Sequence, residues 1–179
     1  DGNYKSSAQI KAAGASLCYS VAVDKSDNIF VTGSTVGATD FGNEKTVTIE
    51  GSNPGTFLAC YNNSLVCQWA IAGSSPVQSY GWAVNFDKEE NILLTGRFGT
   101  TFTISGTDGE ALTTAVGSES SQDTYVAKLS HEGVGRWITY VTNSNRIDTR
   151  SIDSDSQGNV YIWGHCQSAV TPEGQSPLG

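Results

Sequence analysis

Long apolar runs, basic clusters and helical periodicity are all missing from this sequence. No apolar run approaches the roughly 20 residues that a membrane helix needs, so we expect no membrane insertion. Ten lysines and arginines are scattered among eighteen aspartates and glutamates, and the net charge is −8. A nucleic-acid-binding domain normally carries a basic stripe, so nucleic acid is not an expected partner. Without a sustained apolar period of 3.6 residues, the sequence predicts no helices.

Cysteine is scarce and is not arranged for metal binding. The four cysteines form no Cys-x-x-Cys pair, and neither histidine stands at a zinc-finger spacing. We therefore expect no metal and no cofactor. Cys60 and Cys67 flank a turn-rich segment between two apolar strands, and a hairpin there predicts a disulfide and an oxidising compartment. Two half-buried free thiols are the alternative, and a bond between Cys18 and Cys166 is left open.

What the sequence has in abundance is glycine, with serine, threonine and valine, a composition that suits short strands and turns. One twelve-residue pattern occurs three times, at 22–33, 85–96 and 153–164. In each copy an Asp is followed by an Asn four places later and by a Gly five places after that. The pattern predicts a strand, a tight turn and a second strand, with the Asp accepting backbone N–H bonds in the turn and the Gly ending the second strand. The predicted turn residues are Asp24, Asn28, Asp87, Asn91, Asp155 and Asn159.

The third copy of this pattern has some likeness to a calcium-binding loop. It places Asp153, Ser154 and Asp155 before a glycine, but an EF-hand needs an acid at its twelfth position, which here is Gly164. The other two copies carry a lysine beside the key Asp. A hairpin turn explains all three copies through one mechanism, so we favour it over a metal site.

Two more strands follow a long polar connection after each of the first two copies, so a unit of four strands recurs. Radial stacking of such sheets buries both faces of each, which predicts an all-β fold of four-stranded antiparallel blades of a β-propeller. A β-sandwich or a β-solenoid would not need this repeated unit. The predicted divisions are 1–14 as the last strand of a preceding blade, 15–74 and 75–142 as blades, and 143–179 as the first half of another.

Two segments carry a resemblance to a known family. Residues 124–137, which begin Thr-Tyr-Val-Ala-Lys-Leu and end in Trp, and residues 155–164 resemble the SBBP-type bacterial β-propeller repeat, as does the middle part at 32–42. The resemblance covers nearly the whole chain, and departs from the pattern at Gly55 and Cys60. It implies a secreted or surface-exposed bacterial protein but no single activity. A closed ring needs more blades than this chain provides, so we expect a fragment of a longer chain or a propeller completed by other chains.

The propeller resemblance also indicates where a ligand would bind. The connections after the second and fourth strands of propeller blades share one face, which usually carries the ligand site. On that face the sequence places Tyr80, Arg97, Arg146, Asp148, Arg150 and His165. Arg146, Asp148 and Arg150 suit a carboxylate or a sugar, and a solvated charged loop is the alternative. The four tryptophans are expected first as core residues.

Three functions remain open from the sequence. The first is a non-enzymatic extracellular scaffold that presents this face to a protein or glycan ligand, or that builds a surface assembly with the remaining blades or with other copies. The second is a fragment of a propeller enzyme, a lyase or glycoside hydrolase acting on polysaccharide. The third is a subunit assembled through open blade edges. No catalytic residue is assigned, because Asp148 is the one acid placed on the presumed active face and glycoside cleavage needs paired carboxylates.

Overall fold

The chain folds into antiparallel sheets, as the repeated strands predict. The structure, a computed structural model, describes residues 2–115, 122–142, 146–167, 171–172 and 176–177. Its elements in this part of the chain are all strands, so the predicted all-β fold class is confirmed. Within these ranges there is no helix of the length and apolar character that crossing a membrane requires.

The first large sheet has six strands. In spatial order they are β11 (Ala111–Ala115), β10 (Thr101–Ser105), β7 (Cys67–Ser74), β6 (Gly55–Tyr61), β3 (Ile29–Thr35) and β2 (Ser16–Val23). The four strands β2, β3, β6 and β7 are paired in chain order, each antiparallel to the next. Alternating apolar and small residues along β2 and β3 allow this pleated pairing.

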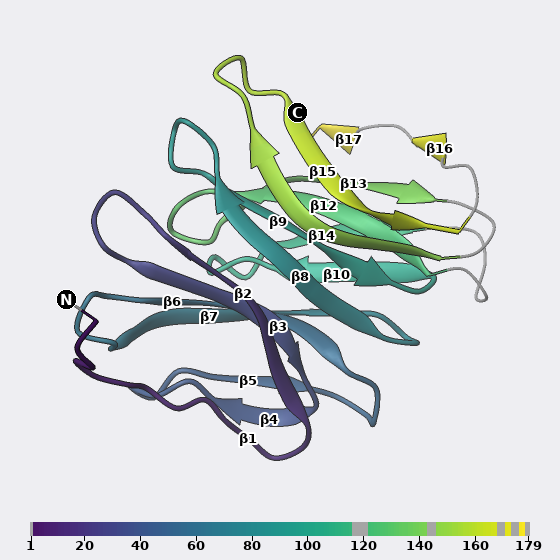
Figure 1. Cartoon of the computed structure of the whole chain (residues 1–179). Helices are drawn as coiled ribbons and strands as arrows, with labels where there is room; N and C mark the ends of the chain where they lie inside the picture. The colour runs from purple at the N-terminus through teal and green to yellow at the C-terminus, as the bar shows by residue number, and fades with distance from the viewer. Residues whose placement is uncertain (1, 116–121, 143–145, 168–170, 173–175, 178–179) are drawn as a thin grey trace.

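The other sheets repeat or extend this arrangement. The second large sheet consists of β8 (Ser79–Phe86), β9 (Ile92–Phe98), β12 (Asp123–Leu129) and β13 (Gly135–Thr142), with β16 (Thr171–Pro172) and β17 (Ser176–Pro177) both paired to β13. A third sheet contains β14 (Ile147–Ser154) and β15 (Val160–Cys166). Figure 1 shows the sheets stacked in chain order, with β2, β8 and β14 side by side.

The long connections between second and third strands, predicted as polar connections, contain hairpins. β4 (Gly37–Asp40) pairs with β5 (Thr46–Ile49), and β10 pairs with β11. β10 also joins β7, the last strand of the preceding blade, and β4 joins β1 (Lys11–Ala12) in the same antiparallel manner. The hairpin in each long connection therefore pairs with a strand that precedes its own repeat in the chain, β1 in one case and β7 in the other.

The apolar core lies between the stacked sheets. Phe30 and Leu58 of the first sheet pack with Val84 and Leu94 of the second in one buried cluster. A further cluster joins Leu93 to Ile152 of the third sheet. Burial of such side chains contributes roughly 1.5–3 kcal/mol each, so the interfaces between repeats supply much of the stability.

The tryptophans divide between core and surface. Trp69 and Trp137 are partly buried and pack on these two clusters, in keeping with the predicted core role. The same expectation is wrong for Trp163, which is 79% exposed. Side chains alternate along a strand, and on β15 it is Val160 and Ile162 that face the core, so Trp163 points to the opposite side.

The predicted disulfide between Cys60 and Cys67 is wrong. All four cysteines are free thiols. The β6–β7 ladder shifts register between Cys60 and Tyr61, so Cys67 lies opposite Tyr61 while Cys60 lies opposite Trp69. Cys60 therefore belongs to the core between the large sheets, and Cys67 to a cluster on the other face of its sheet. Thiols on opposite faces cannot form a bond, so the argument for an oxidising compartment from this pair falls.

Candidate functional site

The hairpin turns at one end of the blades are held by their aspartates. Asp24 Oδ1 accepts hydrogen bonds from the backbone N–H groups of Ser26 and Asn28 at 2.8 and 2.7 Å, and Asn28 Nδ2 donates to Oδ2 at 2.8 Å. The turns at Asp87 and Asp155 repeat this pattern. Each carboxylate thus fixes the register of one hairpin.

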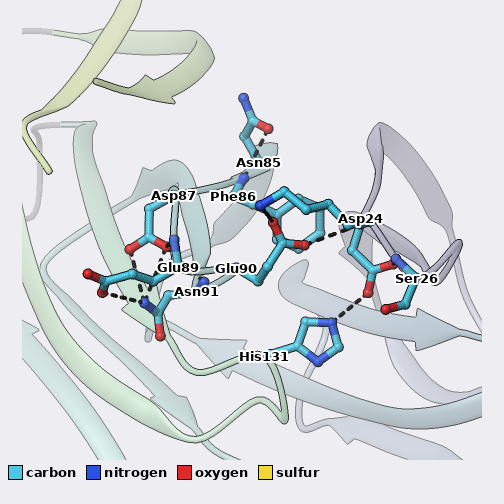
Figure 2. Close-up of polar contacts among 10 residues, drawn as sticks. Asp24, Ser26, Asn85, Phe86, Asp87, Glu89, Glu90, Asn91 and His131 are labelled. Atoms are coloured by element: carbon cyan, nitrogen blue, oxygen red, sulfur yellow. Dashed lines mark hydrogen bonds and ion pairs between the residues drawn. The ribbon is translucent and has the colours of Figure 1, made fainter. Parts of the chain in front are cut away.

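Contacts across the turns join neighbouring repeats. Figure 2 shows His131 pointing toward Asp24, with 2.5 Å between His131 Nε2 and Asp24 Oδ2. His131 is part-buried and lies edge-on to the ring of Phe30. Lys25 forms an ion pair with Glu90 of the next turn at 2.6 Å. The charges at this end are therefore used to connect repeats.

The opposite end of the same hairpins carries a bulge in each repeat. The ladders of β2–β3, β8–β9 and β14–β15 all shift register at one position, where Tyr19, Trp82 and Arg150 respectively have no partner. A bulge turns the extra side chain out of the regular alternation. These three residues occupy the same place in their repeats, on the first strand of each.

The repeated glycine is opposite this bulge, so the prediction that it ends the second strand is wrong. Gly33, Gly96 and Gly164 all lie inside their strands. A Cβ added to any of them would collide with a backbone carbonyl oxygen of the first strand. The carbonyl belongs in each repeat to the residue two places before the bulged one, namely Leu17, Tyr80 and Asp148. Glycine is required here because the bulge brings two backbones together.

The three bulged side chains form a stack across the repeats, called here the bulge column (Tyr19, Trp82 and Arg150). The rings of Tyr19 and Trp82 have centroids 4.3 Å apart, and the guanidinium carbon of Arg150 lies 4.8 Å from the Trp82 ring. Tyr80 stacks beside Trp82 with centroids 5.5 Å apart. The aromatic side chains are half-buried and Arg150 is exposed, so the column forms part of the surface.

An arginine cluster adjoins the column, defined by Arg97, Arg146 and Arg150 around Asp148. Arg146 Nη2 lies 2.6 Å and Arg150 Nη2 3.8 Å from Asp148 Oδ2, while Arg97 Nη1 lies 3.3 Å from Oδ1. The side chains of Arg97 and Asp148 are 9% and 6% exposed, and those of Arg146 and Arg150 are 41% and 58% exposed. Asp148 thus holds three cations, of which two extend to the surface.

Among the described residues, Nε of Arg97 and Nε1 of Trp82 are buried donors in this region with no hydrogen-bond partner. The Arg97 guanidinium lies over the Tyr80 ring, 4.7 Å from its centroid, which is a favourable cation–π position. An unpaired buried donor costs about 1–3 kcal/mol. Guanidinium groups bind carboxylates and phosphates through paired hydrogen bonds, so the arrangement suits an anionic group.

The structure brings together five of the six residues placed on the ligand face by sequence. Tyr80, Arg97, Arg146, Asp148 and Arg150 are in mutual contact through the interactions above. His165 lies opposite Asp148 in the β14–β15 ladder with an exposed side chain. Sequence reasoning missed Tyr19 altogether and took Trp82 first as core. Their shared repeat position, five residues before each turn Asp, is the signal that would have found them.

Other features of the molecule do not add to this site. One hollow of about 870 Å³ lies between β5, β7 and β10, and another of about 530 Å³ lies between the turns that contain Lys25, Lys88 and Ser156. In the described part of the chain, no group of three or more His, Cys, Asp and Glu side chains is arranged to hold a metal ion.

Comparison with known proteins gives a family for the repeat. A family model described as the SBBP beta-propeller repeat matches residues 7–42, the segment that contains the first bulge, the first turn and the glycine opposite the bulge. A search of curated proteins finds no match. The stacked antiparallel sheets fit a partial propeller. Residues 7–42 are therefore identified as one SBBP beta-propeller repeat, and the all-β sheets around it are consistent with a partial propeller.

Proposed function

We propose that this chain is a non-enzymatic binding and scaffold module of a secreted or cell-surface protein, and that its arginine cluster holds an anionic group of the ligand. The observation that carries the proposal is the meeting of three guanidinium groups at one carboxylate. The chain as a whole is acidic, with a net charge of −8, so a local excess of cations is not a consequence of composition.

The members of the cluster differ in their exposure to solvent, and this difference indicates different roles in binding. Arg97 and Asp148 are nearly enclosed, so they form a fixed base. Arg146 and Arg150 reach the surface from this base, and Asp148 restrains both. Pre-organised side chains lose less entropy when they bind. A carboxylate that approaches from solvent would therefore meet donors already in place.

Binding is favoured over cleavage at this cluster. Cleavage of a glycosidic bond by the usual route needs two carboxyl groups roughly 5–10 Å apart, one of them available as an acid. Both oxygens of Asp148 are engaged by arginines. An anion-binding role uses every charged group of the cluster, whereas a polysaccharide lyase or hydrolase would need groups that the cluster does not supply.

The test is a calorimetric titration with two carboxylated probes, tetraglutamate and a disaccharide of glucuronic acid and glucose. We expect at least one of them to bind, and binding to weaken at least tenfold in an Arg146→Ala, Arg150→Ala double variant, since each charged hydrogen bond contributes about 1.5–3 kcal/mol. Lys88→Ala, which removes a cation at the turn end, is the matched control and should bind as the wild type does. Absence of binding to both probes, or equal binding by the double variant, would refute the proposal.

A further inference from the structure

The members of the bulge column occupy the same backbone position in the three repeats but have different side chains. All three repeats place the bulge at the same residue and a glycine opposite it. The bulge is fixed by the backbone and by that glycine, so the bulged side chain is free to differ. It is Tyr19, Trp82 and Arg150 in turn. Bulges often re-aim side chains beside binding sites.

The chemistry of the column changes from one end to the other. Tyr19 and Trp82 offer aromatic surface, while Arg150 offers a cation that also belongs to the arginine cluster. Tyr19 is the first member, so one face of its ring is not covered by another member of the column. A ligand along the column would therefore meet an apolar ring surface at one end and guanidinium groups at the other.

We propose, on the basis of the function proposed above, that the bulge column binds a glycan in which a carboxylated sugar adjoins a neutral one. The carboxylated sugar lies at Arg150 and the cluster, and the neutral sugar packs its C–H face on Tyr19. Aromatic side chains with one apolar face and a polar handle suit such half-wet contacts. The chain's net charge of −8 opposes a ligand that carries a charge on every unit.

An acidic peptide is the competing ligand, and the geometry favours it less. A run of acidic side chains would gain from Arg146 and Arg150 but would leave the aromatic end of the column without a partner. A glycan of the proposed kind uses both ends. The two ligands differ in whether Tyr19 contributes, and that difference is measurable.

The experiment compares the affinity for the glucuronic acid–glucose disaccharide with that for glucuronate alone. Tyr19→Ala should weaken disaccharide binding about two- to tenfold and leave glucuronate binding unchanged, because the aromatic contact is worth about 0.5–1.5 kcal/mol. Arg150→Ala should weaken both. Tyr19→Phe keeps the ring and should restore disaccharide binding. Tyr161→Ala, which removes an exposed aromatic from β15, is the control.

The outcomes separate this proposal from the one on which it rests. Equal disaccharide binding by Tyr19→Ala and wild type, or tighter binding of tetraglutamate than of the disaccharide, overturns the glycan proposal and leaves anion binding in place. Binding of none of the probes overturns both. Thermal unfolding of each variant shows whether a lost affinity reflects a lost fold.

Discussion

Single residues in this protein are fixed by contacts that their neighbours in the chain do not reveal. The repeated glycine is the clearest case. The sequence shows that Gly33, Gly96 and Gly164 recur, and a strand end is the ordinary interpretation of a glycine after an apolar run. The structure gives a different reason, the close approach of a carbonyl at the bulge. Glycine is required because of a carbonyl on the adjacent strand, so the residues next to each glycine in the sequence do not show why it is needed.

Replacement of the central glycine tests this explanation. Gly96→Ala should lower the free energy of unfolding by about 3 kcal/mol, because the new methyl group meets the backbone carbonyl of Tyr80, which cannot move without breaking the bulge. Chemical denaturation measures the change. Gly99→Ala is the control, since its added carbon meets only the side chain of Val77. Equal stability of the two variants would contradict the account.

The turn aspartates predict how stability depends on acid. Burial alone would raise the pKa of Asp24, but hydrogen bonds from Asn28, His131 and Ser26 lower it below its ordinary value of 3.8. Because the pKa of Asp24 is lower in the folded than in the unfolded state, its ionised form stabilises the fold at pH values above the unfolded-state pKa. That stabilisation is lost as the pH falls through the folded-state pKa. Asp24→Asn should therefore flatten the loss of stability as the pH falls below the ordinary aspartate pKa of 3.8.

The control for the Asp24 prediction is the replacement of an exposed aspartate, measured over the same pH range. Asp108→Asn removes an exposed acid from a turn between β10 and β11, and should lose stability with acid as the wild type does. Urea denaturation at several pH values gives the free energies. A wild-type slope retained in Asp24→Asn would show that the buried turn carboxylate does not contribute.

At the scale of elements, the four-strand unit could be predicted, but the role of the long connections could not. Alternation along the strands and the Asp-to-Asn turn indicate the hairpins directly. The β10–β11 hairpin pairs with a strand of the preceding repeat, so its partner is distant in sequence and no local period marks it. Phe102 is buried there against Tyr125, with ring centroids 4.0 Å apart.

Register irregularities were also beyond sequence reasoning. A regular β6–β7 hairpin permits Cys60 and Cys67 to face each other. The shift between Cys60 and Tyr61 sends them to opposite faces, and a one-residue slip changes the face of a side chain. The same kind of shift creates the bulge column, which is why Tyr19 escaped notice and Trp82 was assigned to the core.

Thiol labelling tests the register of this hairpin. Burial raises the pKa of Cys60 to about 12 and that of Cys67 to about 11, and the thiolate is the reactive form. A thiol reagent at neutral pH should therefore modify exposed Cys18 and Cys166 in the folded protein, and all four cysteines after denaturation without reductant. An intact mass lower by two hydrogens, or only two reactive thiols in the denatured chain, would show that a disulfide exists after all.

The two ends of the stacked sheets differ in how their charged side chains are arranged. At the turn end, ion pairs such as Lys25–Glu90 connect one repeat to the next. At the bulge end, three arginines surround the buried carboxylate of Asp148, and two of them, Arg146 and Arg150, reach solvent. The propeller resemblance predicts that all four residues of the arginine cluster, including Asp148, lie on one face. Arg146 and Arg150 stand two residues on either side of Asp148 in the sequence. The approach of Arg97 from β9 depends on how the second and third sheets stack, which no local pattern records.

Amide hydrogen exchange with and without the glucuronic acid–glucose disaccharide tests the central claim, that the bulge end binds the ligand. We predict slower exchange at 79–84, which carries Tyr80 and Trp82, and at 146–151, which carries Arg146, Asp148 and Arg150. Exchange at the turns 24–28, 87–91 and 155–159 should not change. Protection confined to the turns, or no protection at the bulge end when the disaccharide is bound, would contradict the account.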